Sequence, residues 1–322
     1  AIVDKKGLTP RQIQSNFLDV VINDVVLPKN GSGSLGNVAT DDVYGLPLSV
    51  DTMMMFYNKD ILNTEGVATV PTKWTEFQEE IQKVTKIDTN LKLVRPGAVI
   101  GTASNVPRSS DLLARLMMQS GTQMTDDYGN ISFHLLPPNF TRPTPPGIDA
   151  LRFYTEFAIP QRKVYTWNEL QPDGLEAFIQ GRVAFMFGYA YQLPLIRARA
   201  PKLNLGIAPV PQQTPTQPIN IADYWVETVS KKSVNKDVAW DFILFATGID
   251  NVKSYLTATQ KPTALRTYVS VQKDDVVLGP FADQLLTAKS WYRGKDGLAA
   301  DKVMGEIITA PLAAITAGHN EA

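Results

Sequence analysis

A group of polar and aromatic side chains lies where predicted strands end or where loops enter helices, and together they suit the recognition of a carbohydrate. An aromatic ring packs against the C–H face of a sugar, while carboxylate, amide and guanidinium groups bond its hydroxyls. Ligands of α/β proteins bind beyond the carboxyl ends of strands or between lobes. The candidates are Asp51, Asn105, Arg108, Ser109, Tyr189, Tyr191, Tyr224, Trp225 and Trp291.

Other chemistries remain open for these residues. Asp51 with Asp223 or Glu227 would supply the paired carboxylates of a glycosidase, although the sequence leaves their separation open. Arg108 would pair with the carboxylate or phosphate of an anionic solute, and the clustered tyrosines would hold ferric iron.

Catalysis has little further support in the sequence. Cysteine is absent, which excludes disulfides, thiolate metal sites and cysteine nucleophiles. The two histidines, His134 and His319, lie far apart, which disfavours a histidine-rich metal site or a serine–histidine triad. The sequence contains no nucleophile motif or cofactor loop. It therefore predicts a protein that is not an enzyme and that uses neither a metal nor a cofactor.

Two loops resemble ligand motifs without completing them. The glycine-rich loop at residues 31–36 lacks the Lys-Ser/Thr pair of a phosphate-binding loop. The run from Asp126 to Asn130 lacks the later ligands and the bidentate glutamate of a calcium loop, so it predicts a hairpin turn.

Composition bounds the function further. The chain has 322 residues, 44% of them apolar, and this length indicates two domains. Its 31 basic and 32 acidic residues give a net charge of −1, which argues against a nucleic acid or an anionic membrane as partner. The sequence contains no run of about 18 apolar residues, which is the length that predicts a membrane span.

The elements that position these residues centre on residues 44–62. Leu46, Leu48 and Val50 alternate as in a half-buried strand, and residues 53–57 are apolar without a break, as in a strand covered on both faces. Asp51 lies between the two runs. It is either part of a polar kink between two core strands or a carboxylate at a crossover between two lobes, at the mouth of a cleft.

These strands alternate with predicted helices of 10–15 residues, which indicates an α/β fold. One helix, residues 233–247, is expected to pack Val238, Phe242 and Ile243 inward, and a closing helix covers about residues 299–316.

Several sequence motifs of the chain resemble motifs of the extracytoplasmic solute-binding proteins of ABC transporters, of the maltose-binding-protein type. They are Gly45-Leu-Pro47, Asp51, Phe56 to Leu62, Pro71 to Phe77, Gly181 to Gly188, and Asn204 to Pro211. The resemblance gives Asp51 the place of an acidic ligand residue. At residues 103–111, where the family often carries an aromatic residue, this chain has Asn105, Arg108 and Ser109, which favour hydrogen bonding over sugar stacking.

The resemblance implies a two-lobe periplasmic-binding-protein fold with a ligand cleft and a hinge of crossover segments. The first lobe would comprise residues 1–50 and 224–263, and the second residues 53–221 and 266–322. The crossovers would lie near residues 51–52, 222–223 and 264–265. Relative to the family pattern, the chain is expected to lack the N-terminal part of the first lobe, the last helix and a signal sequence.

The function implied is capture of a sugar or oligosaccharide by lobe closure and its delivery to the transmembrane subunits of an ABC permease. The expected protein is a monomer in the periplasm or lipid-anchored at the outer face of the cytoplasmic membrane.

Overall fold

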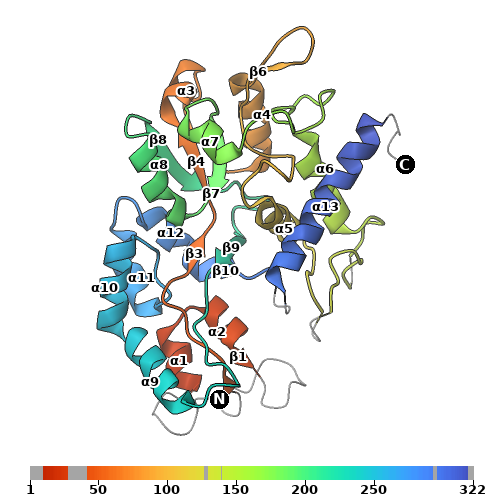
Figure 1. Cartoon of the computed structure of the whole chain (residues 1–322). Helices are drawn as coiled ribbons and strands as arrows, with labels where there is room; N and C mark the ends of the chain where they lie inside the picture. Colours follow the sequence, from red (N-terminus) through yellow and green to blue (C-terminus); the bar gives the residue numbers. More distant parts are fainter. Residues whose placement is uncertain (1–9, 28–41, 127–129, 139, 293–295, 318–322) are drawn as a thin grey trace. The chain divides into compact units, whose positions relative to one another are not determined.

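The computed structural model describes residues 10–27, 42–126, 130–138, 140–292 and 296–317 (Figure 1). The chain divides into two compact units. Unit 1 contains residues 1–53, 189–191 and 220–293, and unit 2 contains residues 54–188, 192–219 and 294–322. The glycine-rich loop at residues 31–36 lies outside the described residues.

Unit 1 is built on a three-stranded sheet with the order β10–β9–β3. Strand β9 pairs in parallel with β10 and antiparallel with β3, and its Asp223 lies opposite Asp51 in register. The strands of the unit are β1 (Val26–Leu27), β2 (Asp42–Val43), β3 (Asp51–Thr52), β9 (Asn220–Asp223) and β10 (Ala288–Lys289). Its helices are α1 (Pro10–Asn16), α2 (Asp19–Val25), α9 (Lys236–Ala246), α10 (Ile249–Thr259), α11 (Arg266–Lys273), α12 (Gly279–Gln284) and the 3₁₀ turn η2 (Leu285–Thr287).

Residues 266–293 correct one boundary expected from the sequence. The predicted second lobe includes them, whereas the structure groups them with unit 1. The physical reason is packing: Val269, Ala282 and Leu285 are buried in the same hydrophobic cluster as α1 and α2. Pairing of β10 with β9 joins the end of this segment to the sheet of unit 1.

Helix α9 corrects a second expectation. Its Ile243 is buried, and Trp240 and Leu244 pack against the core of unit 1. Val238 and Phe242, expected to face inward, are 68% and 67% exposed. The helix is apolar on opposite faces, so the apolar pattern alone did not identify the face that packs.

Unit 2 is built around β4, which is the central strand of the sheet β7–β4–β8. Met54 of β4 pairs with Gly188 of β7 on one side and with Pro209 of β8 on the other. Met54, Met55 and Phe56 are fully buried, which confirms the prediction of a strand covered on both faces. The strands are β4 (Met54–Asn58), β5 (Lys86–Ile87), β6 (Leu93–Arg95), β7 (Phe185–Gly188) and β8 (Leu205–Pro209).

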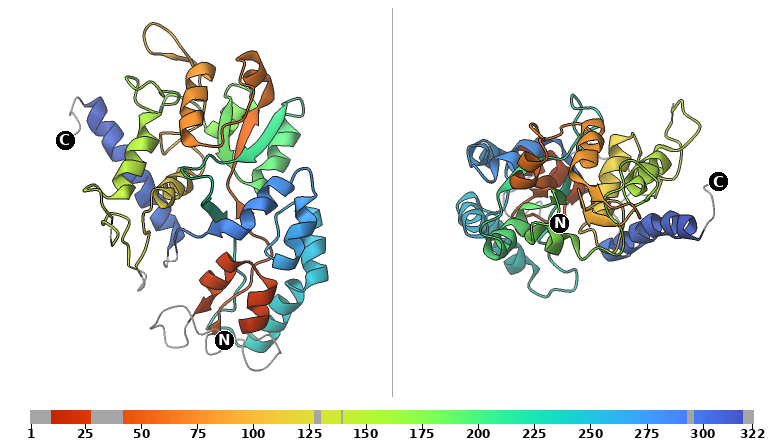
Figure 2. Two further views of the ribbon diagram at one scale, coloured as in Figure 1. Left: turned by 180° about the vertical axis from the view of Figure 1, so that it is seen from behind. Right: turned by 90° about the horizontal axis from the view of Figure 1, so that it is seen from above.

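The longest helices of unit 2 pack together beside this sheet. Helix α5 contacts both α6 and α13, as the views in Figure 2 also show. The helices are α3 (Lys59–Thr64), α4 (Trp74–Val84), α5 (Ser109–Gln119), α6 (Pro146–Glu156), α7 (Gly174–Ile179), α8 (Leu193–Arg199) and α13 (Gly297–Thr316). The 3₁₀ turn η1 (Ala190–Gln192) follows β7 and precedes α8 in the sequence.

An aromatic cluster forms the centre of the core of unit 2. The ring of Phe77, on the buried face of α4, lies 5.4 Å from Trp74 and from Phe185. It lies 5.7 Å from Phe187 and 5.8 Å from Phe157. Each ring therefore contacts others in tilted or edge-to-face orientations, which are the favoured geometries for aromatic pairs.

The ends of the Asp126–Asn130 run form the predicted hairpin turn. Thr125 bridges Ile131 in antiparallel fashion. Asn130 donates from its backbone N–H to Asp126 Oδ1 at 2.8 Å and from its amide to Oδ2 at 2.9 Å. Both carboxylate oxygens thus accept bonds from within the turn, and residues 127–129 lie outside the described residues.

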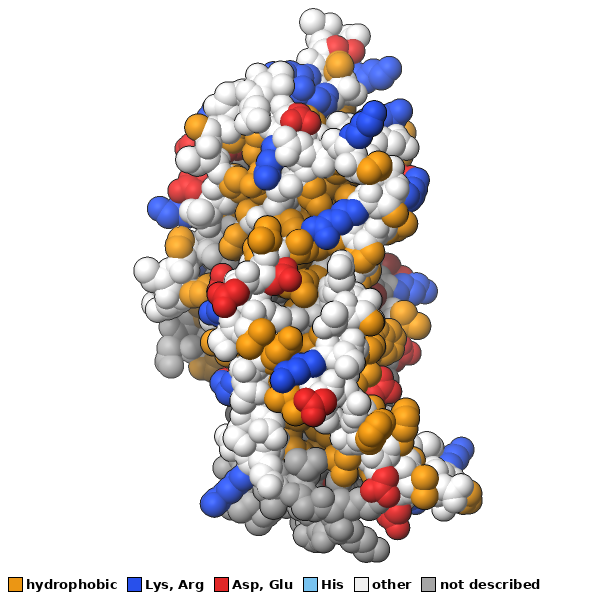
Figure 3. All heavy atoms as spheres, turned by 90° about the vertical axis from the view of Figure 1, so that its left-hand side faces the viewer, with side chains coloured by type: hydrophobic (Ala, Val, Ile, Leu, Met, Phe, Trp, Pro, Cys, Tyr) orange, Lys and Arg blue, Asp and Glu red, His pale blue; other side chains and the backbone are white. Residues whose placement is uncertain are grey.

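The surface carries charges of both signs. On the face drawn in Figure 3, Lys and Arg side chains are interspersed with Asp and Glu side chains, in keeping with the near-zero net charge. Among the described residues, no group of three or more His, Cys, Asp and Glu side chains could hold a metal ion. No helix in the described part of the chain has the length and apolarity needed to cross a bilayer.

Candidate functional site

The predicted site residues fall into two groups, one in each unit. The group in unit 1 is centred on Asp51, a buried residue with 7% of its surface exposed. Its Oδ1 accepts hydrogen bonds from the backbone N–H of Thr52 at 2.8 Å and of Ala190 at 3.1 Å. Its Oδ2 accepts from the backbone N–H of Tyr191 at 3.2 Å. Both carboxyl oxygens are therefore engaged with the chain itself.

The charge state of Asp51 is set mainly by its burial. Desolvation raises the pKa of this carboxyl to about 7, against the lowering effect of its three backbone hydrogen bonds. The neighbouring carboxylate of Asp223 raises the pKa further. The group is consequently poised to change its charge close to neutral pH.

This shift predicts the pH dependence of stability. The pKa of the folded state lies above the ordinary value, so the folded protein binds this proton more tightly than the unfolded chain does. The stabilising contribution of Asp51 is complete below about pH 4 and is lost as the pH rises through 7. Its slope is at most about 1.4 kcal/mol per pH unit.

Urea unfolding of the wild type and of Asp51→Asn between pH 4 and pH 8 measures this contribution. The difference between their unfolding free energies should change in favour of the wild type as the pH falls. Parallel pH curves for the two proteins would show that Asp51 does not titrate in this range.

Tyr189 and Tyr191 lie on the segment that Asp51 holds. Their rings stack with centroids 6.0 Å apart and planes inclined by 13°. Tyr189 is fully buried, whereas Tyr191 is 44% exposed. The sequence predicted both tyrosines as ligand residues, and the structure gives them different surroundings: a buried backing ring and an open ring.

The remaining aromatic candidates of unit 1 also differ from one another. Tyr224 is partly buried against the core, and its hydroxyl contacts the Asp24 carboxylate and the Val20 carbonyl oxygen. Trp225 is 86% exposed. Trp291 is half-buried beside the ring of Tyr292, with centroids 5.6 Å apart. Alternation along an extended chain explains why neighbours such as Tyr224 and Trp225 differ in exposure.

In unit 2, Asn105 is a buried structural hub. Its Nδ2 donates to the carbonyl oxygens of Asn168 and Gln171, each at 2.9 Å. Its Oδ1 accepts from the Trp167 indole N–H at 3.0 Å and from the Thr102 hydroxyl. The side chain thus uses both its amide and its carbonyl to join two loops.

Arg108 immediately precedes α5 in an uncommon backbone conformation. Its φ of 57° lies in the left-handed region, which costs of the order of 1–3 kcal/mol for a non-glycine residue. Its Nε and Nη2 both contact Oδ2 of Asp111, at 2.7 and 2.6 Å. Asp111 is 2% exposed, so this charge pair is partly desolvated and fixes the direction of the guanidinium.

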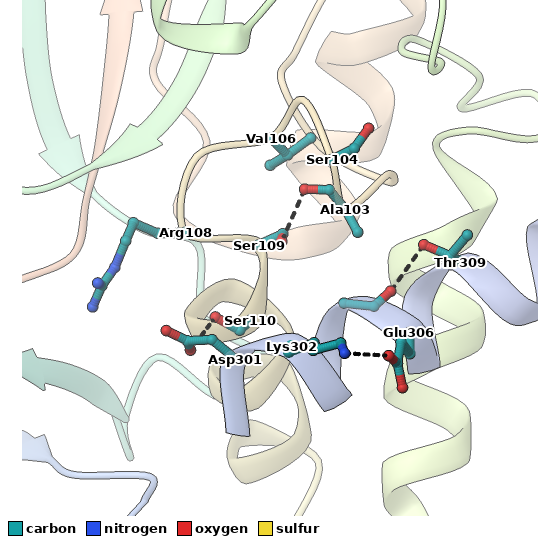
Figure 4. Close-up of a pocket in the computed structure, with 11 residues that line it drawn as sticks. Ala103, Ser104, Val106, Arg108, Ser109, Ser110, Asp301, Lys302, Glu306 and Thr309 are labelled. Atoms are coloured by element: carbon teal, nitrogen blue, oxygen red, sulfur yellow. Dashed lines mark hydrogen bonds and ion pairs between the residues drawn. The ribbon is translucent and has the colours of Figure 1, made fainter. Parts of the chain in front are cut away.

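An open pocket of about 550 Å³ lies beside Arg108, between the loop that enters α5 and one face of α13 (Figure 4). Ser110 donates from its hydroxyl to Asp301 Oδ1 at 2.8 Å, which joins the two walls. Ser109 donates to the Ala103 carbonyl oxygen at 3.3 Å. The full lining is Ala103, Ser104, Val106, Arg108, Ser109, Ser110, Asp301, Lys302, Gly305, Glu306 and Thr309.

The contribution of α13 to this pocket is absent from the sequence prediction. Lys302 and Glu306 form an ion pair at 3.9 Å, and Thr309 donates to the Gly305 carbonyl oxygen. The spacing of polar residues could have predicted a polar face on this helix, because residues at i and i+4 lie on the same face. Which loop that face meets depends on contacts almost 200 residues apart in the chain.

Comparison with known proteins identifies the family. The sequence model of the family of bacterial extracellular solute-binding proteins matches residues 13–277. The chain belongs to this family.

Sequence relatives of this solute-binding protein are distant. A Brucella abortus (strain 2308) protein whose name describes a binding protein is 24% identical over 218 residues, covering 65% of this chain and 47% of its own length. A Brucella suis biovar 1 protein named in the same way matches to the same extent. The chain spans about half the length of the curated relatives it matches.

Solved structures show the same fold. An ABC transporter solute-binding protein from Thermotoga lettingae, bound with α-D-tagatose, has a TM-score of 0.64 at 21% identity, covering 89% of this chain and 72% of its own. A cyclo/maltodextrin-binding protein complexed with maltotetraose has a TM-score of 0.67 at 15% identity, with coverage of 94% and 71%. UgpB from Mycobacterium tuberculosis, in complex with glycerophosphocholine, has a TM-score of 0.62 at 19% identity, with coverage of 85% and 70%.

These matches confirm two sequence predictions: the α/β fold of the solute-binding proteins and the family resemblance. The predicted crossovers, the hinge and the ligand cleft stay predictions.

Proposed function

We propose that this solute-binding protein captures a mono- or oligosaccharide outside the cytoplasmic membrane and delivers it to an ABC permease. The observation that supports this most strongly is the family match over residues 13–277, together with a fold like those of proteins solved with sugars. Binding without turnover is part of the proposal, because these neighbours are named as binding proteins.

The charges of the unit 2 pocket favour an uncharged, hydroxyl-rich ligand. Arg108 and Lys302 are matched by Asp301 and Glu306 around the lining, so the pocket has no excess of either sign. Arg108 is held by Asp111, which offsets the charge that an anionic solute would need. Serine and threonine hydroxyls with carboxylates and an ammonium supply both donors and acceptors, as the hydroxyls of a sugar require.

Hydrolysis of a sugar by paired carboxylates is the second candidate function, with Asp51 and Asp223 as the pair. They face each other across the β3–β9 ladder. Both oxygens of Asp51, however, accept backbone hydrogen bonds, which holds the carboxylate in a structural arrangement. We therefore propose binding as the function.

A thermal-shift panel tests the proposal. Maltotetraose, mannobiose, tagatose, glucuronate and glycerophosphocholine are added separately to the intact chain. A neutral sugar present at about 100 times its Kd should stabilise the protein by about 2.7 kcal/mol, which is a shift of several degrees.

The acidic and phosphate-bearing compounds serve as the matched comparison, and we expect little shift from them. A shift from glucuronate alone would indicate an anionic ligand in place of a neutral sugar, and a shift from glycerophosphocholine alone would indicate a phosphodiester ligand. Release of shorter sugars during incubation with maltotetraose would show that the protein hydrolyses the sugar, and would contradict binding without turnover.

A further inference from the structure

The carboxyl group of Asp51 joins two segments that are far apart in the sequence. Its oxygens accept from the backbone N–H groups of Ala190 and Tyr191 at 3.1 and 3.2 Å. It also accepts from Thr52, the next residue, which fixes the direction of the side chain. The segment 189–191 belongs to unit 1, whereas the residues on both sides of it, Gly188 and Gln192, belong to unit 2. Asp51 thus anchors an isolated three-residue segment to the sheet of unit 1.

The anchored segment carries an open aromatic ring. Tyr191 is 44% exposed, and its ring stacks on the fully buried ring of Tyr189. A buried ring behind an exposed one limits the rotation of the exposed ring. Such a ring is a suitable surface for the C–H face of a sugar.

We propose that Asp51 is a positioning residue, which fixes the backbone at Ala190 and Tyr191 and thereby holds the Tyr191 ring as an aromatic platform for a sugar. Asp51 acts through Tyr191 and does not itself bond the sugar. This inference rests on the proposed sugar-binding function and assigns roles to residues within it.

The acceptor chemistry explains why a carboxylate suits this place. Hydrogen bonds to an ionised acceptor are shorter and stronger than those between neutral groups. Asparagine would keep one acceptor oxygen and would turn a donor toward one of the two N–H groups, while alanine would remove both acceptors. We therefore expect a graded loss, larger for Asp51→Ala than for Asp51→Asn.

The charged groups around Asp51 add a pH signature. Asp223 faces it from β9, and Lys289 on β10 is exposed beyond β9. The carboxyl of α12, Asp283, is paired with Lys273 at 3.0 Å. Because burial and Asp223 raise the pKa of Asp51 to about 7, the share of the ionised acceptor falls as the solution becomes acidic. Sugar affinity should therefore decrease below neutral pH, in the opposite direction to the stability contribution of the same group.

A double-mutant cycle tests the positioning role. The Kd for mannobiose, or for the panel sugar that stabilises the wild type most, is measured for the wild type, Asp51→Ala, Tyr191→Ala and the double variant. Each single variant should lose at least tenfold in affinity, and the double variant should match Tyr191→Ala within about twofold. Losses that multiply in the double variant would mean that Asp51 bonds the sugar directly and would overturn the proposal.

Two further variants refine this test. Asp51→Asn guards against a folding defect in the alanine variant and should remove most of the pH dependence of affinity. Asp223→Asn keeps the hydrogen bonds of Asp51 and removes the neighbouring charge, so it should move the pH profile of affinity toward lower pH. A profile that Asp51→Asn leaves unchanged would contradict the proposal.

Amide hydrogen exchange gives a readout that needs no sugar. Asp51→Ala should speed exchange at Ala190 and Tyr191 at least tenfold. It should leave the Tyr44 amide, which donates to the Val25 carbonyl oxygen in the same unit, unchanged. Unchanged exchange at Ala190 and Tyr191 would overturn the positioning role whether or not a sugar binds. Faster exchange without binding of any panel sugar would support the anchor and overturn the proposed function.

Discussion

Replacing Asn105 with alanine should destabilise the protein by about 2–4 kcal/mol. The substitution leaves the carbonyl oxygen of Gln171 without the Asn105 donor and the Trp167 indole N–H without its acceptor. The carbonyl oxygen of Asn168 loses one of two donors and keeps the bond from the Gln171 backbone N–H. Each buried polar group left unsatisfied costs about 1–3 kcal/mol, and part of this cost is relieved by water entering the loops. Urea unfolding of the intact chain, followed by tryptophan fluorescence, measures the loss.

A matched control is Asn63→Ala, which truncates the same side chain at an exposed position on α3. It should change stability by less than about 0.5 kcal/mol. An Asn105→Ala protein with full stability and impaired sugar binding would contradict this structural role and support the ligand role that the sequence predicts for Asn105.

Phe77→Ala should cost about 3–5 kcal/mol, the range measured for truncating buried aromatic residues. Its ring is fully buried and contacts Trp74, Phe157, Phe185 and Phe187, two of which lie on the central sheet of unit 2. Removing it leaves a cavity at the point where α4 and α6 meet that sheet. Chemical denaturation of the purified variant measures the cost.

Phe242→Ala provides the control for Phe77→Ala. This residue on α9 is 67% exposed, so its truncation should cost less than about 0.5 kcal/mol. Equal costs for the two variants would mean that Phe242 is covered in solution and would restore the inward packing predicted from the sequence.

Local pattern predicted the elements well where one periodicity dominates. The unbroken apolar run ending at Tyr57 predicted the central strand β4 because a strand covered on both faces needs apolar side chains on both. Helix α4 buries Trp74, Phe77, Ile81 and Val84, the stripe that its spacing indicates. Helix α9 is apolar on both faces, so the same reasoning could not decide which face packs.

The contacts made by the site residues could not be predicted from the sequence. The types of Asp51 and Asn105 identified them as chemically important, but their long-range partners lie 139–140 and 62–66 residues away. Whether such a side chain bonds a ligand or the chain itself depends on these long-range contacts, which local pattern does not encode. The same limit hid the α13 wall of the pocket, since the polar face of a helix does not name the loop that it meets.

The two groups of candidate residues have different roles in the proposed function. In unit 1, the buried carboxyl of Asp51 holds the Tyr189–Tyr191 segment and its exposed ring. In unit 2, Ser110 and Asp301 join the walls of a polar pocket with balanced charge. Each group by itself offers a feature used in sugar recognition: an aromatic surface in unit 1 and hydroxyl-binding groups in unit 2.

Isothermal titration of the intact chain with mannobiose, maltotetraose and tagatose at pH 8, with chromatography of the recovered sugar, tests the central claim most directly. We predict that one of them binds with a stoichiometry of one and is recovered unchanged. Absence of binding for every sugar, or recovery of a cleaved product, would contradict it.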